Sequence, residues 1–350
     1  MMKRNFLRIL AAALPLLCVS LTVTAQDNVL PRTVPHFLQR GDTVALISPA
    51  YHTPDSNVAK AGRLLRSWGL VPVVGPHVGR VHLGKYAGTE EERLSDLRWA
   101  LEDSSVKAII ANRGGYGTLH MVDKIGLEVF SANPKWIVGY SDITTLLGME
   151  ARAGVAAIHG TMCASMADDP EGQSAEMLRR CLSGVLPAYE LPPHPCNIQG
   201  RCEGVLVGGN LCTLLPLLGT AADPFEADDV ILFVEEVGES MHNIDRLFSM
   251  LRLRGVLDRC RGVVLGDFTD CGREFSYASV EEMLSRMLSP YGIPVLCGFP
   301  AGHGKLNLPL FTGVRASMDV RPDGASLSFK IAGTRQYQVN TAALTGQAAR

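Results

Sequence analysis

The segment KWIVGYSDITTLL, residues 135–147, decides the fold, because an apolar strand pattern gives way within four residues to a helical one. Such a junction lifts the side chain at its turn off the sheet and points free helix N–H groups at the same place. Ser141 stands at this turn, followed by Asp142. The junction therefore predicts either a nucleophilic serine or a serine that caps the helix, with Asp142 favoured in the first turn.

Strand and helix patterns alternate before this junction. Apolar runs at 43–47, 70–74 and 106–111 predict strands. One helical pattern lies between the first two runs, and a second begins after a capping box at Thr89. This alternation predicts an α/β fold with a mainly parallel, flavodoxin- or Rossmann-like sheet covered by helices on both faces. In such sheets the working residues gather at the carboxyl ends of the strands, where Ser141 falls.

The composition of the chain changes after residue 168, where prolines become frequent. We interpret 26–168 as an N-terminal α/β domain that carries Ser141, and 169–200 as a linker. Further strand and helix patterns over 201–335 predict a C-terminal, mixed α/β domain. Residues 336–350 have little apolar pattern and are interpreted as a tail.

The first 25 residues have the features of an export signal: a basic start with Lys3, Arg4 and Arg8, an apolar run and a small-residue cleavage site. The apolar run is shorter than the ~20 residues of a membrane helix, so we expect a cleaved signal, a periplasmic protein and no stable membrane anchor. Cleavage changes the formal net charge from -2 to about -5. No Lys/Arg cluster occurs elsewhere, which argues against nucleic acid as a partner.

Histidines and cysteines are scattered along the chain. His77 with His82, or His159 with Asp168 and Asp169, could be considered as metal ligands, but neither H-E-x-x-H nor C-x-x-C occurs, and we interpret His159 as structural. We therefore expect no metal and no cofactor. Cys196 and Cys202, in the proline-rich segment, are the one pair suspected of forming a disulfide.

Four short motifs together resemble one known family. They are RGGYG at 113–117, GYSD at 139–142, ILFVEEVGESMHNIDR at 231–246 and PVLCGFPAGHGKLN at 294–307. In order and spacing they are similar to the LD-carboxypeptidase family of serine peptidases, which also includes microcin-immunity peptidases. The resemblance extends from about residue 41 to about 319 and implies Ser141, Glu235 and His303 as catalytic residues.

These three residue types fit acyl transfer. A serine hydroxyl needs a base to take its proton, usually a histidine that a carboxylate holds in one tautomer. Glu235 and Glu236 are neighbours on a predicted strand and point to opposite faces, so only one can reach the histidine. The family pattern favours Glu235. From the residues alone, a lone loop histidine such as His303 is most often a surface residue, and the two acids could be plain solvated charges.

The glycine loop at 113–117 has two interpretations. It could cradle a phosphate, but it lacks the Lys-Ser/Thr of a phosphate-binding loop. It fits better as an oxyanion donor, with the backbone N–H groups of Gly115 and Asp142 facing the developing charge. Arg113 and Tyr116 are candidates for substrate contact, Arg113 through a substrate carboxylate, although Arg113 could equally be an ordinary surface residue.

The resemblance implies an exported serine carboxypeptidase whose partner is a murein peptide. The cut bond would join an L-centre, diaminopimelate or lysine, to a C-terminal D-alanine. Two alternatives stay open: a microcin-immunity-type amidase on the same fold, and a non-catalytic periplasmic binding protein with two lobes. The family also suggests a homodimer.

Overall fold

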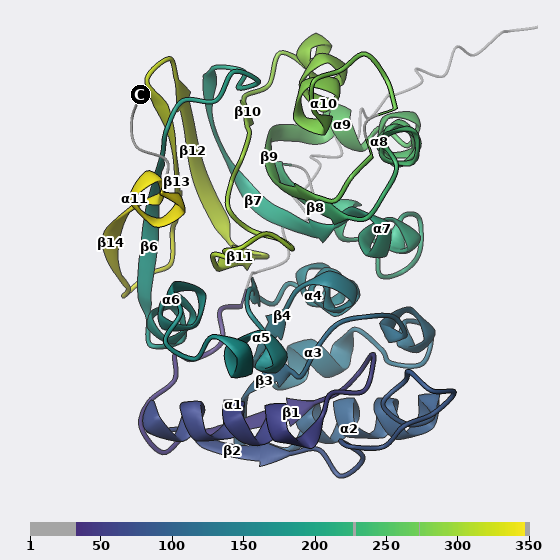
Figure 1. Cartoon of the computed structure of the whole chain (residues 1–350). Helices are drawn as coiled ribbons and strands as arrows, with labels where there is room; N and C mark the ends of the chain where they lie inside the picture. Colours follow the sequence, from purple (N-terminus) through teal and green to yellow (C-terminus); the bar gives the residue numbers. More distant parts are fainter. Residues whose placement is uncertain (1–32, 227–228, 273, 347–350) are drawn as a thin grey trace, which may run out of the picture. The chain divides into compact units, whose positions relative to one another are not determined.

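The computed structural model describes residues 33–226, 229–272 and 274–346, which belong to one compact unit built on two sheets (Figure 1). The predicted export signal, 1–25, lies outside these residues. Across the part of the chain that the structure describes, no helix has the length and apolar character needed to cross a membrane.

The first sheet has the strand order β11-β5-β4-β3-β1-β2. Strands β1 to β5 pair in parallel, and β11 joins β5 in the antiparallel direction. The predicted α/β class is therefore correct, with one antiparallel strand added from late in the chain. The strands are β1 (Thr43–Ile47), β2 (Val71–Val74), β3 (Val106–Ala111), β4 (Trp136–Gly139), β5 (Ala157–His159) and β11 (Leu310–Thr312).

Helices cover both faces of this sheet because successive strand residues point to opposite sides. Val44 and Leu46 of β1 pack in the core cluster that includes α1, α5 and α6, whereas Ala45 and Ile47 pack in the one that includes α2 and α4. The capping box at Thr89 starts α2 as predicted. The helices are α1 (Asp55–Ser67), α2 (Glu90–Glu102), α3 (Glu128–Ala132), α4 (Thr144–Arg152), α5 (Cys163–Asp168) and α6 (Gln173–Leu182), with 3-10 turns η1 (Thr118–Met121) and η2 (Ser141–Ile143).

The second sheet has the order β10-β9-β8-β7-β12-β13-β6-β14. Its first four strands are parallel, β7, β12, β13 and β6 pair antiparallel, and β14 runs parallel to β6. The strands are β6 (Val185–Leu191), β7 (Gly200–Asn210), β8 (Val230–Val237), β9 (Cys260–Thr269), β10 (Val295–Leu296), β12 (Arg315–Arg321), β13 (Gly324–Phe329) and β14 (Arg335–Asn340). Its helical segments are α7 (Leu211–Leu214), η3 (Leu215–Leu217), η4 (Pro224–Glu226), α8 (Met241–Leu253), α9 (Val256–Arg259), α10 (Val280–Leu288), η5 (Ser289–Tyr291) and α11 (Thr341–Thr345).

Two strands, β6 and β11, pair in a sheet that is built mainly by another part of the chain. β6 lies inside the predicted linker, 169–200, yet pairs with β13 and β14 of the second sheet. β11 follows the His303 loop and returns to the first sheet. Most of β14 and all of α11 fall in the predicted tail, 336–350. The domain boundaries themselves stay a prediction.

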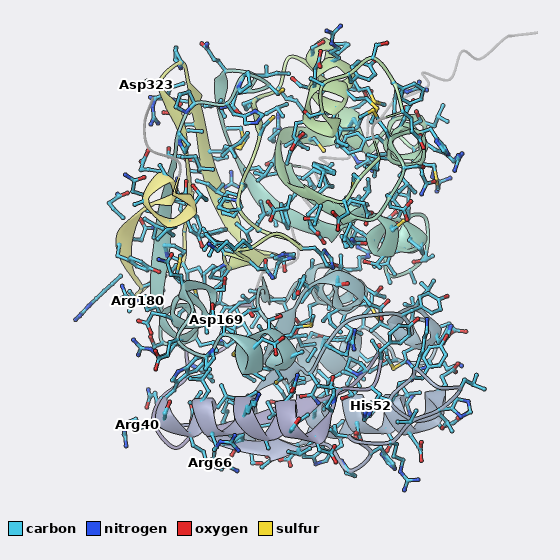
Figure 2. All side chains as sticks on the ribbon, viewed as in Figure 1. Arg40, His52, Arg66, Asp169, Arg180 and Asp323 are labelled. Atoms are coloured by element: carbon cyan, nitrogen blue, oxygen red, sulfur yellow. The ribbon has the colours of Figure 1, made fainter. Side chains whose placement is uncertain are left out.

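The core is continuous through both sheets, because each of the two clusters of buried apolar residues draws side chains from the first and the second sheet. Charged side chains such as those of Arg66, Arg180 and Asp323 are exposed on the surface (Figure 2). All eight cysteines of the described residues are free thiols, so the suspected disulfide between Cys196 and Cys202 is not formed.

Glu150 of α4 is buried in this core, and neither of its carboxyl oxygens has a partner of normal hydrogen-bond geometry among the described residues. Burial raises the pKa of Glu150 well above its ordinary value, and the nearby N–H of Ile137 opposes this only in part. The unfolded chain releases this proton above about pH 4.3, so folding becomes less favourable as the pH rises beyond that point.

We expect Glu150→Met to stabilise the fold by about 1–3 kcal/mol at pH 8, which is the usual cost of a buried polar group without a partner. The gain should shrink toward pH 4, where wild-type Glu150 is protonated in both states. Urea unfolding at both pH values measures it, with Glu102→Met on the exposed side of α2 as the control. An equal gain at both pH values would contradict a buried, titrating Glu150.

Candidate active site

Ser141 stands on a strained turn between β4 and α4. Its φ is +61°, in the left-handed region that non-glycine residues rarely adopt, at a typical cost of about 1–3 kcal/mol. Tyr140 before it is extended, and η2 begins at Ser141 without a side-chain capping bond. Ser141 therefore does not cap the helix. The turn has the sharp geometry that presents a nucleophile above a sheet.

Two threonines hold this turn by its carbonyl groups. Thr213 Oγ1, in α7, donates to the carbonyl of Ser141 at 3.1 Å. Thr118 Oγ1, in η1, donates to the carbonyl of Asp142 at 2.7 Å, and the Thr118 N–H donates to the Asp142 carboxylate at 3.0 Å. Burial raises the pKa of Asp142, while these bonds and the charge of Arg93 oppose the rise. The strained conformation is thus fixed from two elements far apart in sequence.

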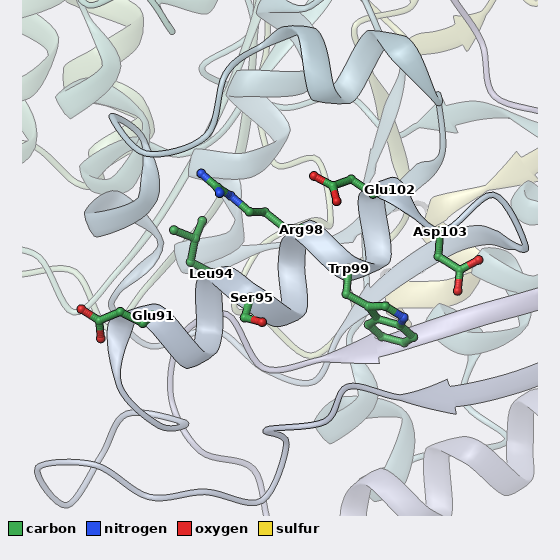
Figure 3. A pocket seen from close by; sticks show the side chains of 7 residues that line it. All are labelled: Glu91, Leu94, Ser95, Arg98, Trp99, Glu102 and Asp103. Atoms are coloured by element: carbon green, nitrogen blue, oxygen red, sulfur yellow. The ribbon is translucent and has the colours of Figure 1, made fainter.

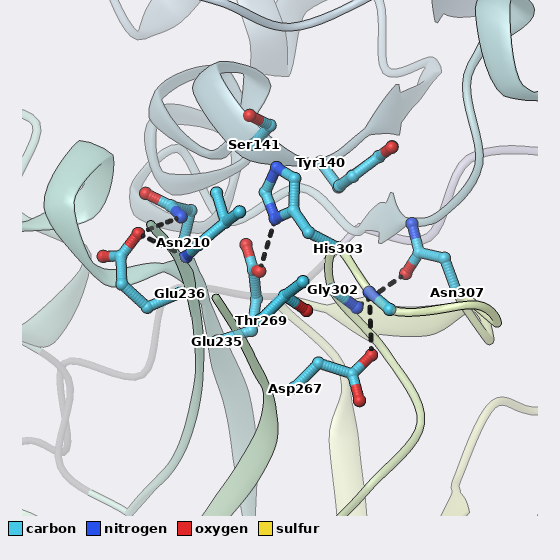
Figure 4. Close-up of polar contacts among 12 residues, drawn as sticks. Tyr140, Ser141, Asn210, Glu235, Glu236, Asp267, Thr269, Gly302, His303 and Asn307 are labelled. Atoms are coloured by element: carbon cyan, nitrogen blue, oxygen red, sulfur yellow. Dashed lines mark hydrogen bonds and ion pairs between the residues drawn. The ribbon is translucent and has the colours of Figure 1, made fainter. Parts of the chain in front are cut away.

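His303 and Glu235 meet beside this turn (Figure 4). Glu235 is fully buried at the end of β8, and its Oε2 accepts a hydrogen bond from His303 Nδ1 at 2.7 Å. That bond leaves Nε2 as the free ring nitrogen, and Figure 4 shows it directed toward Ser141. Among the described residues no hydrogen bond joins Ser141 Oγ to the ring, as is common before a substrate closes the site.

Charge around His303 favours its protonated form. Burial alone would lower the pKa of His303, but the hydrogen bond to Glu235 and the negative charges of Glu235, Glu236 and Asp267 outweigh burial and raise the pKa. A histidine with a raised pKa is a stronger base in its neutral form. The pair therefore suits general-base chemistry close to neutral pH.

Glu236 points to the other face of β8, as strand alternation requires. Its carboxylate accepts from Asn210 Nδ2 at 2.7 Å, from the Cys212 N–H at 2.9 Å and from the Val237 N–H at 3.0 Å. Burial raises the pKa of Glu236, and these three donors oppose the rise. Glu235 thus reaches the histidine, while Glu236 anchors the segment that starts α7.

The glycine loop closes against Ser141. A Cβ atom on Gly114 would lie 3.0 Å from Ser141 Oγ and 3.3 Å from the Asp142 N atom, so only a glycine fits so near. The N–H groups of Gly115 and Asp142, the two predicted oxyanion donors, have no acceptor among the described residues. Both are therefore available to a ligand.

Arg113 and Tyr116, the two candidates for substrate contact in this loop, do not take part in the contacts around Ser141. Arg113 is exposed and makes no ion pair with any described residue. Tyr116 is 42% exposed, and its ring packs edge-on against His120 with centroids 5.2 Å apart. Neither side chain forms a hydrogen bond, ion pair or ring contact with Ser141 or His303, so a role in substrate contact stays a prediction.

Sequence reasoning missed two neighbours of His303. The Tyr140 ring lies 5.0 Å from the His303 ring in an edge-to-face arrangement, and the only sequence signal was its place beside Ser141. Asp267, at the end of β9, accepts from the Gly304 N–H at 3.2 Å. Burial raises the pKa of Asp267 to about 7, and the Gly304 N–H opposes the rise. The apolar strand around Asp267 gave no sign of it.

No competing centre emerges from the described residues. They contain no group of three or more His, Cys, Asp or Glu side chains placed to hold a metal ion. His77 bonds to Asp96 at 2.7 Å and His159 to Asn307 at 3.1 Å. A separate pocket along α2 offers no serine–histidine pair; it is lined by Glu91, Leu94, Ser95, Arg98, Trp99, Glu102 and Asp103 (Figure 3).

Comparison with known proteins adds to this geometry. Residues 44–160 match the N-terminal domain of LD-carboxypeptidases, and residues 203–318 match their C-terminal domain. The murein tetrapeptide carboxypeptidase of Pseudomonas aeruginosa is 32% identical over 281 residues, which is 75% of this chain and 89% of that protein. The microcin C7 self-immunity protein of Escherichia coli is 29% identical over 85% of this chain and 94% of its own length.

Solved structures agree. The crystal structure of a muramoyltetrapeptide carboxypeptidase from Oxalobacter formigenes superposes with a TM-score of 0.76 at 27% identity. The match covers 83% of this chain and 99% of that one.

Proposed function

Because the chain belongs to the LD-carboxypeptidase family and is thus a serine carboxypeptidase, we propose that it removes C-terminal D-alanine from murein tetrapeptides. The cut bond joins D-alanine to the L-centre of diaminopimelate or lysine. The observation that carries the proposal is the buried Glu235 bonded to His303 Nδ1 beside the strained Ser141. The name and coverage of the Pseudomonas aeruginosa relative support this choice of substrate.

The proposed reaction runs through an acyl-enzyme. Ser141 Oγ attacks the carbonyl carbon while His303 Nε2 takes the hydroxyl proton, and Glu235 holds Nδ1–H and stabilises the imidazolium. His303 then gives the proton to the leaving amine of D-alanine, and water releases the acyl group by the reverse route. The N–H groups of Gly115 and Asp142 bind the oxyanion, each worth roughly 3–4 kcal/mol.

The direct test is release of free D-alanine from a defined tetrapeptide with diaminopimelate or lysine at position three. A tetrapeptide that ends in L-alanine serves as the matched control. Release of D-alanine alone supports the proposal, and equal release from both peptides would overturn the assigned stereochemistry. Because a fluorophosphonate reports an activated serine, labelling at Ser141 separates an enzyme from a non-catalytic binding protein.

A second candidate is a microcin-immunity-type amidase, supported by the similarity to the microcin C7 self-immunity protein over 85% of this chain. It would use the same three side chains and differ in the acyl and leaving groups. A panel that adds an aminoacyl-sulfamoyl nucleoside to the murein peptides separates the two candidates. Turnover of the nucleoside with no D-alanine release would favour the amidase.

We further propose export to the periplasm after cleavage behind Ala25, which would bring the enzyme to murein. The mature N-terminus, read by mass spectrometry from a periplasmic fraction, tests this step. The homodimer that the family suggests is a separate proposal, tested by light scattering.

Hydrolysis is expected to survive exhaustive chelation, because the proposed chemistry needs only side chains and backbone N–H groups of the chain itself. The measurement is D-alanine release before and after dialysis against EDTA, with a zinc peptidase treated in parallel. Activity that disappears with EDTA and returns with zinc would contradict the serine mechanism.

A further inference from the structure

Asn307 lies on the segment between His303 and β11, almost fully buried. Its Oδ1 accepts two hydrogen bonds: one from the Gly302 N–H at 3.1 Å (Figure 4), and one from His159 Nε2 at 3.1 Å. Its own N–H donates to Ser174 Oγ at 3.0 Å, which ties the segment to α6. One side-chain oxygen therefore connects the loop of His303 with a strand of the first sheet.

The orientation of this amide is determined by its partners. The Gly302 N–H can only donate, so the oxygen of Asn307, and not its nitrogen, must face it. His159 Nε2 must then carry a proton to share the same acceptor. Burial lowers the pKa of His159 to about 3, so His159 stays neutral with its proton on Nε2.

Both ends of this link lead to the proposed catalytic residues. His159 of β5 pairs with Gly139 of β4, two residues before Ser141. Gly302 directly precedes His303, has a φ of +132°, and would place a Cβ atom 2.7 Å from Glu235 Oε2. The backbone there is pressed against the carboxylate, and a small shift of the loop would move the histidine ring.

We propose that Asn307 is a positioning residue, whose shared acceptor oxygen fixes the His303 loop relative to β5 and β4, the strand that ends just before Ser141. The inference rests on the proposed function of those two residues. A misplacement of about 1 Å is enough to cost on the order of 100-fold in rate, so a single shared hydrogen-bond acceptor at this place has a large effect.

Asn307→Ala tests the proposal because it removes the acceptor. We expect kcat to fall by about 10- to 100-fold, as for a misplaced base, and KM to change less than about two-fold. Asn197→Ala is the matched control, because Asn197 Oδ1 also accepts a backbone N–H of this part of the chain. That donor is Cys297, six residues before His303, at 2.8 Å. That variant should lose thermal stability while keeping kcat and the pH profile.

Asn307→Asp keeps the acceptor oxygen and adds a negative charge on the loop of His303. The other charged or titratable neighbours of His303 are Glu235, Glu236, Asp267, His159 and Tyr140. An added negative charge favours protonated His303, so the acidic limb of kcat/KM should move to higher pH while the alkaline rate recovers above that of Asn307→Ala. A purely structural role for Asn307 predicts no such shift.

Titration of ¹⁵N-labelled histidine by NMR gives a readout that needs no activity. His303 should titrate at higher pH in Asn307→Asp than in the wild type, and His159 of the wild type should be neutral and protonated on Nε2. An Asn307→Ala enzyme with wild-type kcat and pH profile would overturn the inference, as would an unmoved His303 titration in Asn307→Asp. If Ser141→Ala keeps full activity, the proposed function fails instead, and the NMR titration still decides the role of Asn307.

Discussion

Replacing Ser141 with alanine is expected to lower kcat for D-alanine release by roughly 10⁴- to 10⁶-fold, as in other serine hydrolases that lose their nucleophile. Substrate affinity should change little, because the hydroxyl is needed only for bond making. Steady-state kinetics and calorimetric binding of an intact tetrapeptide measure the two effects. Adding His303→Ala to the Ser141→Ala enzyme should cost little more, since the two residues act as a unit.

The strained backbone at Ser141 allows a second, independent test of this prediction. At a φ of +61°, glycine is tolerated better than alanine, so Ser141→Gly should be as inactive as Ser141→Ala yet more stable by about 1 kcal/mol. Thermal unfolding of both variants measures the difference. A residual rate near that of the wild type would exclude Ser141 as the nucleophile, and a less stable glycine variant would contradict the strained turn.

The second large effect is expected at Glu235. Glu235→Gln should lower kcat by about 10²- to 10⁴-fold, because His303 loses the carboxylate that fixes its tautomer and stabilises its charged form. The acidic limb of the pH profile should move to lower pH, since the negative charge that raises the pKa of His303 is gone. Kinetics between pH 5 and 9 measure both changes.

Glu236→Gln is the matched control for that prediction, one residue further on the same strand. Glu236 serves three donors and does not touch the ring, so the substitution should cost about 1–3 kcal/mol of stability while kcat falls less than about ten-fold. If Glu236→Gln were the crippling change and Glu235→Gln the harmless one, the assignment of faces on β8 would be wrong.

Local patterns predicted the elements that depend on local physics. The apolar run at Thr43–Ile47 is β1 without any change of bounds, and the capping box at Thr89 starts α2. The proximity of His303 to a glutamate and the choice of Glu235 followed from the motif resemblance. Alternation along a strand added that only one of Glu235 and Glu236 can reach the ring. These features depend on side-chain periodicity or on a short motif, both of which are visible in the sequence.

Features that depend on distant partners were not predictable. The left-handed φ of Ser141 is stabilised by Thr118 and Thr213, and Ile143 stands where an elbow motif would have glycine. β14 lies in a segment with little apolar alternation, and its place is decided by pairing with β6. Asn307 ends the motif at 294–307, but nothing in that motif indicates its contact with His159, 148 residues away.

The crossing of β6 and β11 between the halves has a consequence for how the protein is made. As the nascent chain leaves the ribosome, β6 has no partner until β13 emerges more than 130 residues later, and the β5 edge stays open until Thr312 is out. Unpaired strand edges are aggregation-prone. The growing chain is therefore exposed to aggregation until β13 has paired with β6 and β11 with β5. Either half expressed alone would keep an unpaired strand edge. Hydrolytic activity would appear only when translation is almost complete, because His303 and β11 lie near the end of the chain.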